Sequence, residues 1–391
     1  MDLAAARRLE PTTVKGKVRP LERGHAENIG IEGRYFGNVG DVDGDVMYRT
    51  EIHDEPSHSI SKQTAPNSVA YTVCSKQRSP ARRSHLRQTW HMTSPSTLDW
   101  YGCATFRLKT ADLTIFLDAY IDRVPSAAGT GLTADDIDEC DWIVVGHSHF
   151  DHLWGAERIA KNTGATIICS YESVRVMEQA GVPTDQLICV AGGETIELGN
   201  GVKVSVYPSQ HSCVWSHSQM GQPDQVCIGE LGVTWHEQQE RMADLMRYLQ
   251  EETAPEVVAH IVAGAPGHSE RGDGGALVFL FETPDGSLFF QDTSGHWSGV
   301  LRDIRPDVAI LGAAGRGNID GEPVQGSLAQ FVARQADLLR PKKVILGHHD
   351  DWLPGFSIPT DTAPIREELG RVVPTTSMIE MGYLESMAIF D

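Results

Sequence analysis

Positive charge is scarce in this chain of 391 residues. Lysine and arginine together number 33, against 53 aspartates and glutamates, so the formal net charge is −20. Proteins that bind nucleic acids hold the phosphate backbone with a surplus of basic side chains, and we therefore expect no nucleic-acid partner. A basic run at residues 76–87 is a local exception. We expect a solvated face or a contact within a homo-oligomer there, in preference to an anion site.

Long apolar runs and paired cysteines are also missing. No stretch of about 18 apolar residues occurs, and the first residues lack the apolar core of a signal peptide. The seven cysteines are odd in number, scattered, and contain no Cys-x-x-Cys pair, which argues against a disulfide framework. We therefore expect a soluble protein without a membrane span, in the reducing cytoplasm.

The chain changes character near residue 97. Residues 1–96 have few periodic apolar runs and many Gly, Pro, Ser and His residues, so we predict an irregular extension packed on the core. From residue 97 to 391, strand patterns alternate with helical ones, which indicates one α/β domain. The expected strands are residues 105–108, 113–118, 142–145, 166–168, 187–190, 202–206, 276–281, 288–290, 307–311 and 343–346. The expected helices are residues 153–162 and 171–180, and one that Ser327 and Gln330 cap.

A dense group of histidines follows the apolar run at residues 142–145. After Gly146 the chain presents His147, His149, Asp151 and His152 within six residues. Imidazole and carboxylate suit Zn and neighbouring transition metals, and this spacing can point alternate side chains at two adjacent ions. The alternative is a polar loop with chance histidines.

Further metal-binding residue types follow strands downstream, which favours the metal site. They are His211, Asp292 and His348. In this order the motifs resemble the signature of the metallo-β-lactamase superfamily of hydrolases. The stretch from Asp99 to Phe106 resembles the opening strand of the ascorbate-6-phosphate lactonase-like and N-acylphosphatidylethanolamine phospholipase D-like branch. Those relatives usually carry histidine where this chain has Cys103.

The resemblance implies a fold and a set of metal ligands. The fold would be a metallo-β-lactamase-like αββα sandwich of two βα halves, with the metals at one edge of the sheets. The first metal would be held by His147, His149 and His211, the second by Asp151, His152 and His348, and Asp292 would bridge both. The cofactors would be two divalent transition-metal ions, Zn first, with Mn or Fe as alternatives.

A two-metal centre of this kind explains why no side-chain nucleophile is obvious. The sequence has no Gly-x-Ser-x-Gly elbow, and two ions about 3.5–4 Å apart can hold a bridging hydroxide and polarise a carbonyl or phosphoryl oxygen. Asp151 and Asp292 are the candidate catalytic residues. Asp151 could pass a proton to the leaving group, and a single-metal site would leave it free to do so.

The expected activity is hydrolysis of a small-molecule ester. A lactone or a sugar-phosphate lactone comes first, phosphodiester cleavage of the phospholipase D-like type is the alternative, and a metal-binding redox or non-catalytic protein is the alternative of another class. The candidate substrate-binding residues stand in loops after the motif strands, where ordinary loop residues are the competing interpretation. They are His217, His268, His296, Arg316 and His349.

Residues 214–274 are expected to be an insertion that borders the active-site mouth and influences specificity. Thr234 and Glu237 have the spacing of a capping box, and an apolar face follows at helical spacing. That face consists of Met242, Leu245, Met246 and Leu249. We expect it to pack in a core in preference to binding lipid. The glycine-rich residues 264–275 are either a mobile lid or a surface loop.

Overall fold

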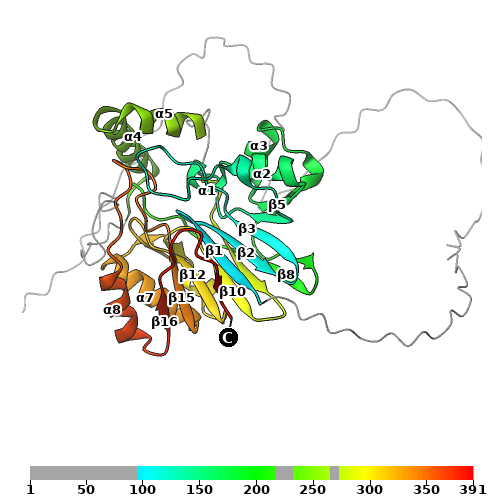
Figure 1. Ribbon diagram of the computed structural model, residues 1–391. Coiled ribbons are helices and arrows are strands. Elements are labelled where there is room, and N and C mark those ends of the chain that lie inside the picture. The colour runs from blue at the N-terminus through cyan, green and yellow to red at the C-terminus, as the bar shows by residue number, and fades with distance from the viewer. Residues whose placement is uncertain (1–94, 216–231, 265–272, 391) are drawn as a thin grey trace, which may run out of the picture. The chain divides into compact units, whose positions relative to one another are not determined.

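The computed structural model describes residues 95–215, 232–264 and 273–390, which belong to one compact unit, Leu86–Asp391. Most of the expected N-terminal extension, the basic run at residues 76–87, and the candidates His217 and His268 lie outside the described residues. The described residues form two large mixed β-sheets and several helices (Figure 1).

The first sheet has seven strands. In spatial order they are β17 (Met387–Ala388), β1 (Thr97–Gly102), β2 (Thr105–Thr110), β3 (Leu113–Leu117), β4 (Trp142–Val144), β5 (Thr166–Cys169) and β6 (Leu187–Cys189). Strands β3 to β6 run parallel, whereas β1, β2 and β3 form an antiparallel meander.

The second sheet also has seven strands. They are β16 (Ser377–Ile379), β15 (Lys343–Gly347), β12 (Val308–Gly312), β10 (Ser287–Phe290), β9 (Leu277–Glu282), β8 (Val202–Pro208) and β7 (Thr195–Gly199). The expected hairpin of β9 and β10 is present, with Phe290 opposite Phe279. A small third sheet contains β11 (Gly295–His296), β13 (Asn318–Ile319) and β14 (Glu322–Pro323).

Alternation along the strands divides the core into layers. In β12, Val308 and Ile310 join a cluster that contains residues of both large sheets, whereas Ala309 and Leu311 join a cluster with helical residues. This follows from the two-residue period of a strand, which sends successive side chains to opposite faces. The two large sheets therefore pack face to face, and each has a second apolar face that must be covered.

Helices cover those outer faces. Helices α2 (Ala156–Thr163) and α3 (Tyr171–Gln179) pack on the first sheet, and α6 (Ser298–Leu301), α7 (Leu328–Leu339) and α8 (Ala363–Val372) pack on the second (Figure 1). Two single turns of 3₁₀ helix, Ala134–Asp136 and Thr184–Gln186, complete the first half. The αββα sandwich expected from the resemblance is confirmed.

Two expected elements were wrong in detail. The helix predicted at residues 153–162 is present as α2, which begins three residues later, and residue 153 ends a separate short helix, α1 (Phe150–Leu153), with Gly155 between the two at φ 127°. A Cβ there would meet the carbonyl oxygen of Ala119, so the glycine allows a turn that no other residue fits. The single opening strand expected at residues 99–106 is the β1–β2 hairpin, and Cys103 sits in its turn at φ 50°.

The expected insertion contains two helices, α4 (Trp235–Glu252) and α5 (Pro255–Gly264). The capping box is present: the Thr234 N–H and hydroxyl each donate to Glu237 Oε2 at 2.8 Å, and the Glu237 N–H donates to Thr234 Oγ1 at 3.3 Å. Among the described residues, no helix combines the length and hydropathy needed to span a bilayer. The described cysteines are all free thiols, in keeping with the sequence.

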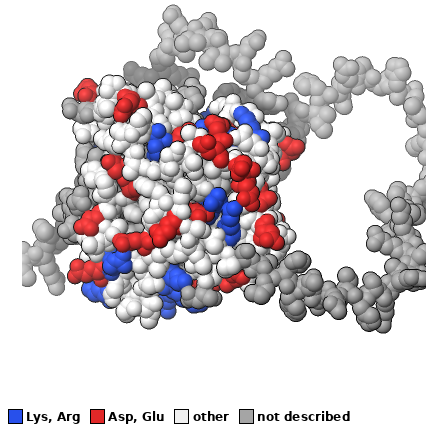
Figure 2. Space-filling model, viewed as in Figure 1, with Lys and Arg blue, Asp and Glu red and all other residues white. Residues whose placement is uncertain are grey.

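Charge is distributed without a dominant basic surface on the face drawn in Figure 2. Lys and Arg side chains lie interspersed with Asp and Glu there. The expectation that nucleic acid is not a partner stays a prediction.

Candidate metal centre

Four of the seven residues expected as metal ligands lie just after strands, and the other three, His149, Asp151 and His152, lie at the start of α1 or within it. His147 follows β4, His211 follows β8, Asp292 follows β10 and His348 follows β15. Because β4 is parallel to β3 and β5, and β10 is parallel to β12 and β15, their carboxyl ends lie at one edge of each sheet. Loops at such edges are where open α/β sheets place ligands. The two βα halves thus bring distant side chains to one place.

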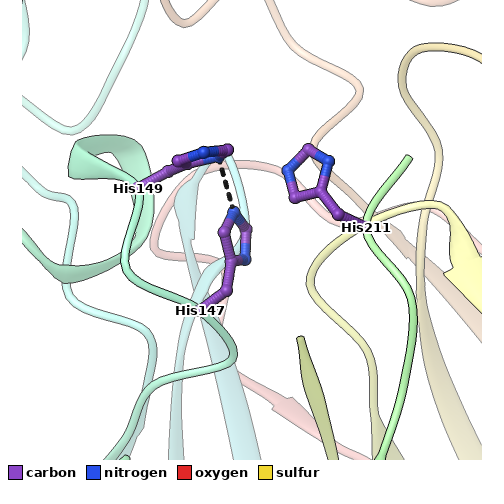
Figure 3. Close-up of side chains that lie close together, drawn as sticks. All are labelled: His147, His149 and His211. Carbon is purple, nitrogen blue, oxygen red and sulfur yellow. Dashed lines mark hydrogen bonds between the residues drawn. The ribbon is translucent and has the colours of Figure 1, made fainter. Parts of the chain in front are cut away.

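The first cluster contains His147, His149 and His211, whose rings converge (Figure 3). His147 Nε2 lies 3.0 Å from His149 Nδ1, close to the roughly 3.3 Å that separates two nitrogen ligands on a tetrahedral zinc ion. His211 Nδ1 lies 2.8 Å from the carbonyl oxygen of Ser212. A proton on Nδ1 would leave Nε2 as the nitrogen available to a metal.

The second cluster centres on Asp151. Its Oδ2 lies 3.2 Å from His348 Nε2 and 3.5 Å from His152 Nε2. Cys103 Sγ belongs to the same group, because its sulfur, a carboxylate oxygen of Asp151 and a ring nitrogen of His348 all lie within 4.8 Å of one another. Cys103 therefore lies beside the second cluster.

Asp292 lies between the two clusters. Its Oδ2 is 2.7 Å from His147 Nδ1 and 3.3 Å from His152 Nδ1, whereas its buried Oδ1 has no hydrogen-bond partner. Gly146 makes room for this carboxylate, since a Cβ at Gly146 would overlap it. An unpartnered carboxylate oxygen in a fully buried position is costly unless a cation or a donor compensates it. A metal ion would supply that compensation.

The charges of the cluster also suit bound cations. Burial lowers the pKa of each histidine of the first cluster, so these rings are neutral, the form that binds metal. Burial alone would lower the pKa of His152, but three surrounding carboxylates raise it well above its ordinary value. Those carboxylates belong to Asp151, Asp118 and Asp292. The cluster therefore attracts positive charge, whether a proton or a metal ion carries it.

Asp118 is part of this arrangement, although the sequence analysis treated it only as the end of a strand. Its Oδ2 lies 2.7 Å from His152 Nδ1, and its Oδ1 accepts the Gly146 N–H at 2.9 Å. Burial, followed by the nearby charge of Asp292, raises the pKa of Asp118 to about 7. In the sequence Asp118 is marked only by its position at the end of an apolar strand, and this position does not show that it reaches His152. Asp118 orients His152 so that Nε2 faces Asp151.

The described candidates for substrate binding lie away from the cavity at the centre. His296 is buried beside Phe331, and burial lowers its pKa to about 4. Arg316 is 6% exposed, and its carbonyl oxygen accepts the Cys213 N–H. The His349 ring stacks on Trp100, with centroids 4.6 Å apart. None of the three lines the cavity.

Asp350 follows the two adjacent histidines and lies beside the β1–β2 turn. Its carboxylate accepts the Cys103 N–H at 2.9 Å and the Tyr383 hydroxyl at 2.9 Å. It thereby fixes the β1–β2 turn beside the second cluster. Its partners are thus a backbone amide and a phenol.

A cavity of about 180 Å³ opens over both clusters. Its floor includes His149, Asp151, His152, His211, Asp292 and His348. Helices α4 and α5 form part of its wall through Met242, Leu245, Met246 and Ile261. The insertion therefore borders the mouth of the site, as expected. The described part of the apolar face of α4 lines this cavity, whereas the sequence predicted a closed core.

Comparison with known proteins finds a similar domain. Residues 114–230 match the Beta-lactamase superfamily domain. This part of the chain is therefore similar to that domain. The match begins in β3 and includes the His147–His152 motif and His211.

Similar proteins include several named metal-dependent hydrolases. A "UPF0173 metal-dependent hydrolase" of Pyrobaculum calidifontis is 32% identical over 115 residues, which are 29% of this chain and 50% of that protein. Another, from Anaeromyxobacter sp., is 38% identical over 102 residues, 26% of this chain and 34% of that protein. The alignments thus span at most about half the length of the curated relatives.

Among solved structures, Igni18, a metallo hydrolase from Ignicoccus hospitalis, aligns with 75% of this chain and 98% of its own, at 16% identity and a TM-score of 0.48. The match to the superfamily domain itself covers residues 114–230. The lactonase-like branch stays a prediction.

Proposed function

We propose that this chain is a metal-dependent hydrolase that opens a small ester, with a lactone as the first candidate. The observation that carries the proposal is the convergence of seven histidine and aspartate side chains from both halves of the sandwich, all but His147 lining one cavity. The names of the similar proteins, metal-dependent hydrolases that match 26–29% of this chain, support it.

The imidazole and carboxylate groups of these seven residues suit two divalent metal ions, with Zn as the first candidate. His147, His149 and His211 would hold the first ion, Asp151, His152 and His348 the second, and Asp292 both. When bound, the ions would supply Lewis acidity toward water and toward the substrate carbonyl.

The chain's own residues would do the remaining work. Asp118 holds the His152 ring through Nδ1, and Gly146 leaves space for the Asp292 carboxylate. Asp151 lines the cavity, where one of its oxygens could take the proton that the attacking water loses as its oxygen bonds to the acyl carbon. It could then return that proton to the departing alkoxide oxygen as the acyl–oxygen bond breaks. The apolar wall limits access of bulk water to that step.

Metal analysis combined with a substrate panel tests the proposal. Purified, metal-supplemented protein should contain up to two transition-metal ions per chain and should hydrolyse at least one neutral lactone or ester, with activity lost on chelation and restored by metal. A panel of phosphodiesters and amides serves as the comparison. Protein that retains no metal, or that cleaves phosphodiesters and leaves every lactone and ester intact, would contradict the proposal.

A further inference from the structure

Part of the cavity wall is apolar, and its composition bears on the substrate. It includes Met242, Leu245 and Met246 of α4, Ile261 of α5, and Leu353 and Phe356 from the loop after β15. We propose that the substrate is an ester or lactone that carries an apolar chain or ring and has no charge on the part remote from the reacting bond. This inference rests on the proposed function.

Charge in the described cavity supports an uncharged substrate. No Lys or Arg is among the described residues that line it, and its ionisable lining residues other than histidine are Asp151, Asp292 and Asp350. An anionic group far from the metal ligands would lose its hydration without gaining a described cationic partner, and it would also face carboxylates. This observation disfavours the phosphorylated sugar lactone expected from the resemblance, because its phosphate lies away from the scissile bond.

The apolar wall is held in place by contacts that do not involve a substrate. The Tyr120 hydroxyl lies 2.8 Å from His260 Nε2 on α5, and Val257 of the same helix is buried in an aromatic cluster. On the other side, a Cβ on Gly355 would lie 3.2 Å from Thr253, so the loop after β15 packs closely on the α4–α5 junction. The wall is therefore preformed, and binding need not first order it.

The size of the cavity suits a sizeable apolar group. Its volume of about 180 Å³ exceeds the roughly 150 Å³ of engineered apolar cavities that bind benzene. Each methylene buried against such a wall contributes roughly a fourfold gain in kcat/KM until the cavity is filled.

A chain-length series tests the inference. Neutral aryl esters with straight acyl chains of increasing length would be compared with matched esters whose acyl chains end in a carboxylate. We expect kcat/KM to rise roughly fourfold per methylene for the neutral series and to fall for the charged one. Met246→Gln, which keeps length but adds an amide to the wall, should flatten the rise. The matched control is Tyr248→Gln, since the Tyr248 side chain lies on the same helix and is 47% exposed. This variant should leave the rise in kcat/KM with chain length unchanged.

A binding measurement separates this inference from the proposed function. Calorimetry with a neutral long-chain methyl ketone, which has no ester bond, reports on the cavity alone, and metal content and melting temperature confirm that each variant is folded. If the ketone binds, loses affinity in Met246→Gln, and no ester is hydrolysed, the proposed function fails and the apolar site stands. If esters are hydrolysed at rates independent of chain length, or the charged series is preferred, the apolar-substrate inference is overturned and the proposed function stands.

Discussion

The cavity has two contrasting sides. Its metal floor consists of the seven expected metal ligands, of which all but His147 line the cavity. Four of them, His147, Asp151, His152 and Asp292, are buried. Hydrogen bonds between side chains from the two halves of the fold link His147 to Asp292 and Asp151 to His348. Its helical wall, formed by α4 and α5, contributes half-buried apolar side chains from helices whose other faces expose Tyr248 and Val262. Metal chemistry fixes residue types in the floor, whereas any apolar residue of suitable size can serve in the wall. Mutations in the metal floor should therefore change metal binding and turnover, whereas mutations in the helical wall should change substrate preference.

Asp292→Ala should produce the largest effect, because Asp292 lies between both clusters. We expect loss of most bound metal at both positions and of nearly all turnover, roughly 10³-fold or more. Elemental analysis and steady-state kinetics measure this. Met246→Gln is the matched change in the helical wall and should keep its metal. Equal metal loss in both variants would break the division between floor and wall.

Asp118→Asn should give the next largest effect. The amide keeps the size of the carboxylate but removes the charge that pairs with His152 Nδ1 at 2.7 Å. Removing partners of this kind typically costs about 10–100-fold in metal affinity or activity. Competition with a chromophoric chelator measures the affinity. The control is Asp307→Asn, because the Asp307 carboxylate accepts the Ser287 N–H and is remote from the metal floor. A metal affinity in this control as low as that of Asp118→Asn would point to a general loss of folding.

Adjacent His348 and His349 should respond differently to alanine. His348 Nε2 lies 3.2 Å from Asp151, and its backbone is held at φ 61° with its N–H donating to the Cys103 carbonyl oxygen. His348→Ala should therefore lower metal content. The His349 ring stacks on Trp100, so His349→Ala should keep the metal and lower the free energy of unfolding by about 1–3 kcal/mol.

Metal analysis and chemical denaturation on the two variants decide between these assignments. The sequence had favoured a substrate-facing His349, whose loss would change KM. Normal stability with a changed KM in His349→Ala would restore that earlier interpretation.

Much of the floor could be predicted because its signals are local or ordered along the chain. The apolar run before Gly146 and the dense histidine motif after it mark a strand and its ligands within ten residues. The strands before Asp292 and His348 were equally visible in their apolar periodicity. The carboxyl ends of parallel strands then bring the side chains to the same edges of the sandwich.

The remaining features of the site could not be predicted from the sequence, because they depend on tertiary geometry. Nothing in the sequence around Asp118 shows that its carboxylate reaches His152, because that contact depends on the pairing of β3 with β4. The apolar side chains of α4 have the same spacing whether they enter a closed core or line a cavity. His296, Arg316 and His349 follow motif strands in sequence, but where their side chains lie depends on backbone direction after the strand, which residue type does not determine.

His296 gives the smallest effect expected at neutral pH, because it lies outside both the metal floor and the helical wall. Its pKa is lowered by burial from 6.5 to about 4 in the folded protein. At a pH between these two pKa values, the unfolded chain binds a proton at His296 more readily than the folded protein does. His296 therefore lowers the free energy of unfolding as the pH falls from about 6.5 to about 4, by up to about 3 kcal/mol. In His296→Gln that contribution disappears, whereas turnover at pH 7 should be unchanged. Urea denaturation of metal-free protein and variant should therefore show the variant gaining stability relative to the original chain as the pH falls. A difference in unfolding free energy that stays constant from pH 7 to pH 4 would mean that His296 does not titrate in this range.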